Sequence, residues 1–101
     1  MKLDPEKVKA ELSNMPGWEL NGNSLVKTFR FKDFSSSVEF LAMIRPIADS
    51  LNHHPDVCIN YDKVKVELTT HDEGGVTEKD IYLAKRIQGV YDALFADELN
   101  S

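Results

Sequence analysis

The sequence predicts an α+β domain: a four-stranded antiparallel sheet with three helices packed on one face, in the order α-β-β-α-β-β-α. Three segments carry apolar residues at helical spacing, and two pairs of short segments between them alternate apolar and polar residues. A turn joins the members of each pair, as in β-hairpins, so strands and helices form separate layers. The length of 101 residues favours a single domain over 1–101.

The N-terminal part of the chain predicts a short helix and a first hairpin. Asp4-Pro5 is typical of an N-cap followed by a first helical residue, and Pro16-Gly17 ends the apolar periodicity. Asn21-Gly22-Asn23 is a strong turn signal. It separates a short extended segment at 18–20 from a strand that we expect at about 25–31.

A longer helix is predicted between Asp33 and the His53-His54-Pro55 sequence. Asp33 can cap its N-terminus, and a broad apolar stripe follows at helical spacing. Pro46 lies inside this stripe, where proline removes one backbone hydrogen bond and kinks a helix. We interpret the pattern as one kinked helix, with two helices broken near Arg45 as the alternative.

The clearest strand signal in the chain follows Pro55. Val57, Ile59 and Tyr61 alternate with Cys58 and Asn60, and a second alternating segment runs over 64–69. Asp62-Lys63 separates the two segments and is expected in a turn. The segments are therefore predicted to pair as an antiparallel hairpin, which brings the start of one strand beside the end of the other.

The C-terminal part predicts a loop and a third helix. The loop is expected over 71–75, which contains Gly74-Gly75. Thr77 is a good N-cap, and Asp80 stands three residues later in the place of a capping-box acid. Apolar residues then recur at helical spacing, so the helix should be long and end near Leu99.

Composition excludes several classes of function. The net charge is −5 and the 12 lysines and arginines are scattered, so a direct nucleic-acid partner is not expected. The one cysteine, Cys58, cannot form an internal disulfide. No apolar run approaches the ~20 residues that span a membrane, and residues 1–6 lack the apolar segment of a signal peptide. We therefore expect a cytoplasmic protein without a membrane partner.

The three histidines fall at one end of the second predicted hairpin. His53 and His54 precede its first strand, and His71 follows its second strand. Antiparallel pairing therefore predicts that they converge in space. Imidazole gives or takes a proton near neutral pH, and neighbouring histidines can divide the acid and base roles between them. The pattern favours a site for acid/base catalysis.

Two carboxylates are candidates to support these histidines. Asp49 lies one helical turn before His53, and Asp80 lies in the first turn of the last helix. Either could orient a histidine, although taken alone each is better explained as a solvated or helix-start carboxylate. A zinc site is the alternative use of three histidines, but adjacent His53 and His54 are awkwardly placed to ligate one ion. We predict no metal and no other cofactor.

The segment from Asp49 to Asp80 resembles the signature of the pterin-4a-carbinolamine dehydratases, also called the dimerisation-cofactor family. That signature combines an acidic residue, His-His-Pro four residues later, an aromatic residue six positions after the proline, a further His and a closing Asp. In this sequence these positions are Asp49, His53, His54, Pro55, Tyr61, His71 and Asp80. Many members carry Trp two residues after the proline, where this chain has Val57.

The resemblance implies an enzyme that dehydrates 4a-hydroxy-tetrahydropterin to quinonoid dihydropterin, with the pterin as substrate and no metal or redox cofactor. It implies that His54 binds the region of the 4a-hydroxyl. His53 and His71 would supply the acid and the base, in an order that stays open. Substrate binding or orientation is assigned to Asp49, Pro55, Thr69, Thr70 and Asp80. The two threonines would act through backbone groups at the end of their strand.

The resemblance also implies a homodimer or homotetramer, for which sheet edges and exposed helix faces are natural contacts. Three other functions stay open. The chain could be a non-catalytic protein-binding module, since mammalian relatives also act as a dimerisation partner of a homeodomain transcription factor. It could serve molybdopterin metabolism instead of tetrahydrobiopterin-type recycling. It could also be a structural domain whose histidines are incidental.

Overall fold

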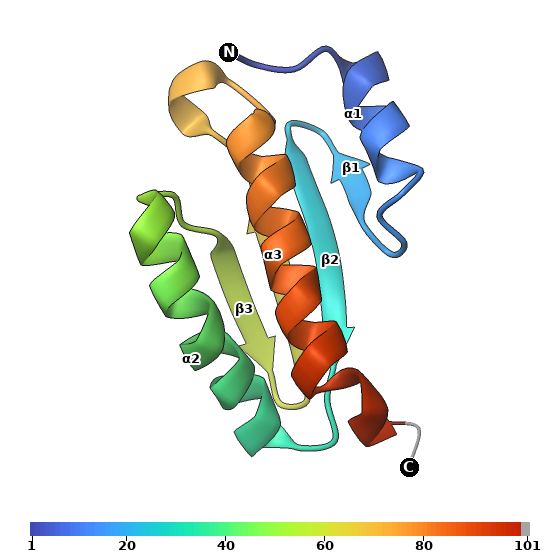
Figure 1. Cartoon of the computed structure of the whole chain (residues 1–101), viewed down its shortest axis with the longest axis vertical. Coiled ribbons are helices and arrows are strands. Elements are labelled where there is room, and N and C mark those ends of the chain that lie inside the picture. The colour runs from blue at the N-terminus through green and yellow to red at the C-terminus, as the bar shows by residue number, and fades with distance from the viewer. Residues whose placement is uncertain (100–101) are drawn as a thin grey trace.

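The computed structural model describes residues 1–99, and its elements follow the predicted order (Figure 1). The predicted domain covers residues 1–101, and the last two of these, 100–101, lie outside the described residues. The helices and strands are α1 (Pro5–Leu12), β1 (Glu19–Asn21), β2 (Ser24–Arg30), α2 (Phe34–Leu51), β3 (Asp56–Asn60), β4 (Lys63–Leu68) and α3 (Glu78–Leu94). Two 3₁₀ turns accompany them, η1 (His71–Glu73) and η2 (Ala96–Leu99). The α+β class and the element order are confirmed.

The strands form one antiparallel sheet in the order β1-β2-β4-β3, so β1 and β3 are its edges. Helices α2 and α3 lie across one face of this sheet, and α1 lies beside β1 (Figure 1). Alternation decides which face is covered, because successive side chains of a strand point to opposite faces. Buried residues on the covered face include Leu25, Phe29, Val64, Val66 and Leu68.

All three helices contribute to this core, through Val8 of α1, Phe40 and Ile44 of α2, and Leu83 and Ile87 of α3. The opposite face of the sheet is largely exposed and mostly polar. The exposed side chains on that face include Thr28, Arg30, Cys58, Asn60 and Lys65. The sheet is therefore covered on one face and open to solvent on the other.

Helix α2 begins and ends where local chemistry dictates, and its end sets up the site. The Asp33 carboxylate accepts a hydrogen bond from the Ser36 amide at 2.8 Å and caps the first turn. The helix continues through Pro46, so one helix is correct and the two-helix alternative is wrong. Asn52 then adopts a left-handed conformation with φ 50°, which ends the helix and directs the chain into His53.

The structure differs from the predicted boundaries at several places. Asn21 and Lys63 were expected in turns, but they are the last residue of β1 and the first residue of β4. Tyr61 was expected in the third strand, but β3 ends at Asn60 and Tyr61 occupies the turn with φ 55°, because a two-residue hairpin loop needs positive φ. Helix α3 ends at Leu94 rather than near Leu99. Phe95 leaves the helix to bury its ring in the core, 5.4 Å from the Phe31 ring. Its packing outweighs the helical periodicity that continues beyond it.

Candidate active site

The predicted site residues come from four segments that meet at one end of the sheet. The segments are the end of α2, the start of β3, the loop after β4 and the first turn of α3. Asp56 pairs with Glu67, so the start of β3 does lie beside the end of β4. The hairpin therefore brings the His53-His54 segment close to the loop that carries His71, as its topology predicts.

His53 and Asp80 form the buried centre of the site. The imidazole Nε2 lies 2.5 Å from Asp80 Oδ1, and the exposed fractions of the two side chains are 12% and 0%. Asp80 is held there because α3 starts at this point, and His53 because Asn52 turns the chain back toward α3. A buried carboxylate requires hydrogen-bond donors, and His53 supplies one of them.

The remaining donors to Asp80 come from two threonines. The Thr70 hydroxyl donates to Oδ2 at 2.8 Å, and the Thr77 amide donates to the same oxygen at 2.9 Å. The two threonine hydroxyls lie 2.8 Å from each other. Thr77 and Asp80 also form the capping box that was predicted for the start of α3. Asp80 therefore links the N-terminus of a helix to an imidazole.

His54 and Asp49 form a second pair, but this one faces solvent. His54 Nε2 lies 2.8 Å from Asp49 Oδ1, and both side chains are more than half exposed. Arg45 approaches the other Asp49 oxygen at 3.8 Å. An exposed pair of this kind contributes little to stability, so His54 is oriented more loosely than His53.

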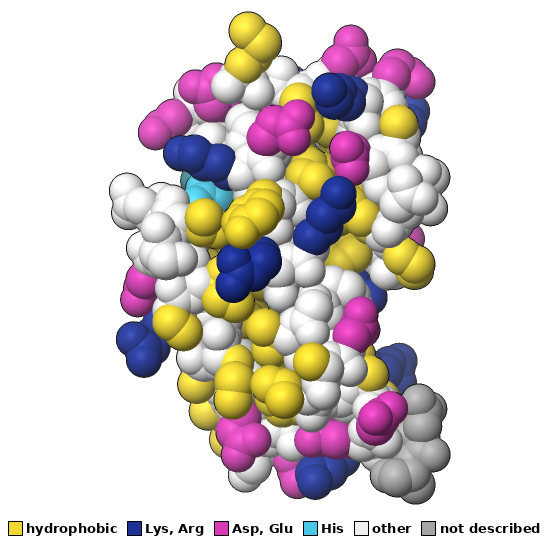
Figure 2. All heavy atoms as spheres, viewed as in Figure 1, with side chains coloured by type: hydrophobic (Ala, Val, Ile, Leu, Met, Phe, Trp, Pro, Cys, Tyr) yellow, Lys and Arg dark blue, Asp and Glu magenta, His cyan; other side chains and the backbone are white. Residues whose placement is uncertain are grey.

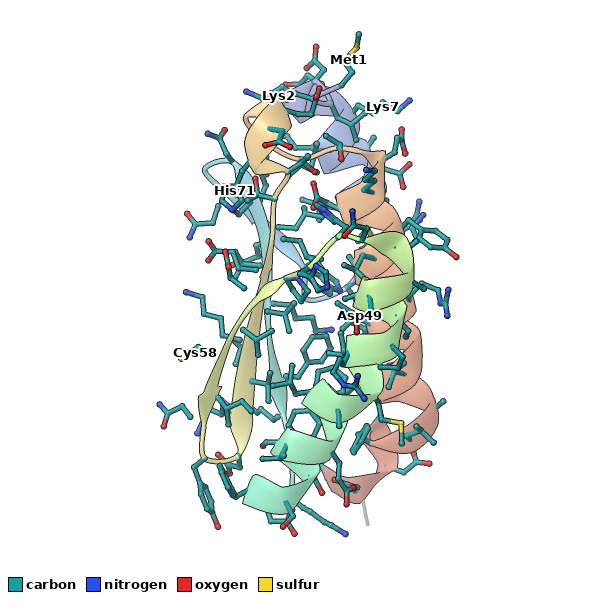
Figure 3. The ribbon with its side chains drawn as sticks, turned by 90° about the vertical axis from the view of Figure 1, so that its left-hand side faces the viewer. Met1, Lys2, Lys7, Asp49, Cys58 and His71 are labelled. Carbon is teal, nitrogen blue, oxygen red and sulfur yellow. The ribbon has the colours of Figure 1, made fainter. Side chains whose placement is uncertain are left out.

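His71 stands apart from these two pairs. It is exposed and opens the η1 turn, and within residues 1–99 its side chain makes no hydrogen bond or ion pair. Figure 3 shows Asp49 on the helix side of the molecule and His71 on the sheet side. The structure thus joins His53 to Asp80 and His54 to Asp49, a pairing that the sequence left open, and the ring of His71 has no hydrogen-bond partner among residues 1–99.

The two threonines after β4, Thr69 and Thr70, form hydrogen bonds with other parts of the chain. The Thr69 hydroxyl donates to the Asn23 carbonyl at 2.6 Å. The Thr70 amide donates to the Gly75 carbonyl, and the Thr70 carbonyl accepts from the Gly75 amide. Thr70 therefore reaches the site through its hydroxyl, whereas sequence reasoning assigned it a backbone contact. Thr77 was predicted only as a helix cap, and the capping-box pattern was its one signal.

Two surface hollows border these residues. One of about 460 Å³ lies between α2 and the start of β3, and His54, Pro55 and Val57 line it. The other, of about 420 Å³, is lined by Thr70 and Thr77 together with 1–3 and parts of η1 and α3. Both volumes fall in the range of small-molecule sites. Thr70 and Thr77 bind Asp80, so the second hollow borders the Asp80 network, whereas the first is lined by His54.

Neither a metal cluster nor a membrane-spanning helix is found in the part of the chain that the structure describes. Among residues 1–99, no three His, Cys, Asp or Glu side chains are grouped so that they could hold a metal ion. No helix within the same residues combines the length and the apolar character needed to cross a bilayer.

Comparison with known proteins places the chain in a family. The model of the pterin 4 alpha carbinolamine dehydratase family matches residues 1–90, which include every residue of the site. The chain belongs to this family. A protein of Sulfurisphaera tokodaii is 57% identical over 86 residues, covering 85% of this chain and 92% of the relative. A protein of Sulfolobus acidocaldarius is 53% identical over 90 residues, covering 89% of this chain and 99% of the relative. Both carry the provisional name pterin-4-alpha-carbinolamine dehydratase.

One solved structure agrees with the assignment to the pterin-4a-carbinolamine dehydratase family, and a second shares the fold. The crystal structure of a transcriptional coactivator/pterin dehydratase from Brucella melitensis has a TM-score of 0.85 and 35% identity, covering 89% of this chain and 98% of that one. A pterin dehydratase-like protein described as a RuBisCO assembly factor of the alpha-carboxysome has a TM-score of 0.59 and 19% identity. That second likeness shows the fold alone.

Proposed function

We propose that the protein dehydrates 4a-hydroxy-tetrahydropterin to quinonoid dihydropterin, as a hydro-lyase. The observation that carries this proposal is the nearly buried His53, bound at Nε2 by the fully buried Asp80. Membership of the dehydratase family supplies the substrate class. A buried carboxylate–imidazole pair is typical of acid/base sites, and Thr70 and Thr77, which bind this carboxylate, line a surface hollow.

The reaction needs one acid and one base and no net redox change. The C4a–O bond breaks and its electron pair leaves with the hydroxyl, which takes a proton and departs as water. N5 loses its proton, and its electrons form the new double bond to C4a. Histidines suit both proton transfers because imidazole exchanges protons near neutral pH.

The contacts of His53 favour it as the base. An ionised carboxylate only accepts hydrogen bonds, so a neutral His53 beside Asp80 carries its proton on Nε2. Its Nδ1 lone pair is then the one that can accept the N5 proton. Proton donation to the leaving hydroxyl falls to His71, whose ring is exposed and has no hydrogen-bond partner among residues 1–99. The arrangement follows the logic of a carboxylate-oriented catalytic imidazole.

The other residues bind and orient. His54, held by Asp49 at 2.8 Å, would contact the region of the 4a-hydroxyl. Pro55 fixes the backbone after the histidine pair and lines the hollow beside His54. Thr69 and Thr70 form the edge of the site at the end of β4, where the pterin ring would meet the strand.

The test is to generate the 4a-carbinolamine in situ and follow its dehydration in the ultraviolet. Wild-type protein should accelerate the reaction, and the His53→Ala and His71→Ala variants should each lose about 10²-fold or more in turnover. The double variant should show no acceleration, while Lys65→Ala on the far face of the sheet serves as the matched control. A folded wild type without acceleration would instead support the non-catalytic, protein-binding alternative.

We further propose that the physiological substrate is a tetrahydrobiopterin-type carbinolamine. The protein would then act in the cytoplasm, in the recycling of a hydroxylase cofactor. The alternative is a pterin of molybdopterin metabolism. Genes beside this one distinguish the two, since an aromatic amino-acid hydroxylase gene supports recycling and molybdopterin genes support the other role.

A homo-oligomer is the expected state of the protein. Strand β3 is an edge of the sheet and offers unpaired backbone groups to a second copy. Helix α2 adds exposed Phe34, Val38 and Met43, and Figure 2 shows hydrophobic side chains gathered over the α2 and α3 side of the molecule. Such patches on an otherwise polar surface mark contact sites between proteins.

A further inference from the structure

Two threonine hydroxyls stand behind the Asp80–His53 pair, and helix capping explains only one of them. Thr77 is the N-cap of α3 and is 5% exposed. Thr70 lies outside the helix, after the end of β4, yet its hydroxyl reaches Asp80 Oδ2 at 2.8 Å. A capping box is complete without this contact. Helix capping therefore does not explain the hydrogen bond from the Thr70 hydroxyl to Asp80.

The donors and acceptors of this network can be assigned in one direction only. A threonine hydroxyl has a single hydrogen, and that of Thr70 is donated to Asp80 Oδ2. Thr70 can then only accept from Thr77, whose hydroxyl lies 2.8 Å away. Because Oδ2 already takes hydrogens from Thr70 and from the Thr77 amide, Oδ1 is left to face His53.

We propose that Thr70 and Thr77 are positioning residues for the reaction: their hydroxyl chain fixes the rotation of the Asp80 carboxylate and thereby holds His53 in the tautomer protonated on Nε2. The consequence for catalysis rests on the proposed dehydratase function, whereas the effect on the tautomer does not. Without the hydroxyl chain, the Thr77 amide is the one remaining contact described for Oδ2, so Asp80 can turn about it and leave Nε2. His53 would then also populate the form in which Nδ1 carries the proton and cannot act as a base.

Nitrogen-15 NMR of the imidazole rings tests the proposal directly. The chain has three histidines, so His54→Gln and His71→Gln variants suffice to assign His53. At about pH 8, where a histidine of ordinary basicity is neutral, wild-type His53 should show Nε2 as the protonated nitrogen. Thr70→Val and Thr77→Val should shift the His53 signals toward a mixture of tautomers. Thr70→Ser and Thr77→Ser keep the hydroxyl and should restore the wild-type signals.

Two further variants make the readout decisive. Thr28→Val removes a hydroxyl from the exposed face of β2 and should leave the His53 signals unchanged. Thr77→Val also weakens the cap of α3, so Thr70→Val is the variant that decides, with Thr70→Ala in its place if the valine variant does not fold. Unchanged His53 tautomer populations in the folded Thr70 variant would overturn the proposal.

Turnover separates this inference from the proposed function. In an active enzyme, Thr70→Val should lower kcat roughly tenfold with little change in KM, because the hydroxyl that it removes is bound to Asp80, while the Thr70 backbone at the edge of the site is retained. Thr70→Ser should recover most of the loss. If the wild type proves inactive while the tautomer still responds to Thr70, the positioning role stands and the dehydratase function fails. If the wild type is active and the tautomer does not respond, the positioning role fails alone.

Discussion

At the scale of single residues, the two aspartates of the site have similar partners but different surroundings. Asp80 is fully buried and bound by three groups, whereas Asp49 is half exposed beside Arg45. Desolvation strengthens electrostatic contacts, and solvent weakens them. The same aspartate-to-asparagine change should therefore have unequal effects on the two histidines.

Asp80→Asn should lower turnover by about 10²-fold or more, because an amide at this position can donate a hydrogen bond and favours the wrong His53 tautomer. Asp49→Asn should lower turnover by less than about fivefold, because its partner His54 is held only at the solvent-exposed surface. Steady-state kinetics on both variants measures the difference. Equal losses would mean that burial does not distinguish the two pairs.

Sequence reasoning predicted that both aspartates and the three histidines belong to one site, because spacing and topology are visible in the chain. The structure shows contacts of His53 with Asp80 and of His54 with Asp49. It assigned Thr70 a backbone role and gave Thr77 none beyond its cap. Those hydroxyl contacts depend on side-chain rotamers and on the distance between β4 and α3. Neither quantity can be predicted from the hydrophobic periodicity of the sequence. The ring of His71 shows the same limit, since topology brings its segment near the site without fixing where the ring points.

At the scale of elements, the ends of the helices position the site. Asn52 carries the chain from α2 into His53 through a left-handed residue. The predicted strands and helix starts were largely correct, because alternation and capping residues act locally. The end of α3 and the place of Tyr61 were wrong, because burial of Phe95 and the geometry of a two-residue turn override the local pattern.

Asn52→Val should destabilise the protein by about 1–2 kcal/mol, because a β-branched residue is strained in the left-handed region. It should also lower turnover, since the strain is relieved by moving His53. Asn52→Gly is the matched control and should retain both stability and activity, as glycine adopts this conformation freely. Urea unfolding and steady-state kinetics on the pair provide the measurement. A valine variant as stable as wild type would show that the turn does not require this conformation.

The cap of α2 predicts a dependence of stability on pH. Hydrogen bonding to Ser36 lowers the pKa of Asp33 from its ordinary value of 3.8. A lowered folded-state pKa gives a stability contribution that is present above the ordinary value and is lost as pH falls through the folded value. Asp33→Ala should therefore be less stable than wild type near pH 7, and the difference should shrink well below pH 3.8. Urea unfolding at both pH values tests this, and a constant difference would contradict it.

At the scale of the whole molecule, the sheet has one covered and one open face, and the edge at β3 is next to the apolar side of α2. The hollow there is lined mainly by apolar residues of α2 and reaches His54 and Pro55. A second copy bound at this surface would approach the site itself. Association and activity are therefore expected to be coupled.

Val38→Glu together with Met43→Glu should reduce the mass in solution to that of a monomer, because burying either carboxylate in an apolar contact is costly. Light scattering at micromolar concentration measures the mass. Lys9→Glu on α1 alters charge far from this surface and should leave the mass unchanged. A wild-type protein with the mass of a monomer would contradict the expected homo-oligomer.

Asp80 has one further consequence, which concerns local opening of the fold. Because the same carboxylate starts α3 and holds His53, fraying of the first turn of this helix and loss of the aligned imidazole are a single event. Hydrogen–deuterium exchange of the amides at 78–81 therefore reports how often the protein visits an incompetent state. A pterin that binds the aligned state alone must slow that exchange, even where it touches none of those amides.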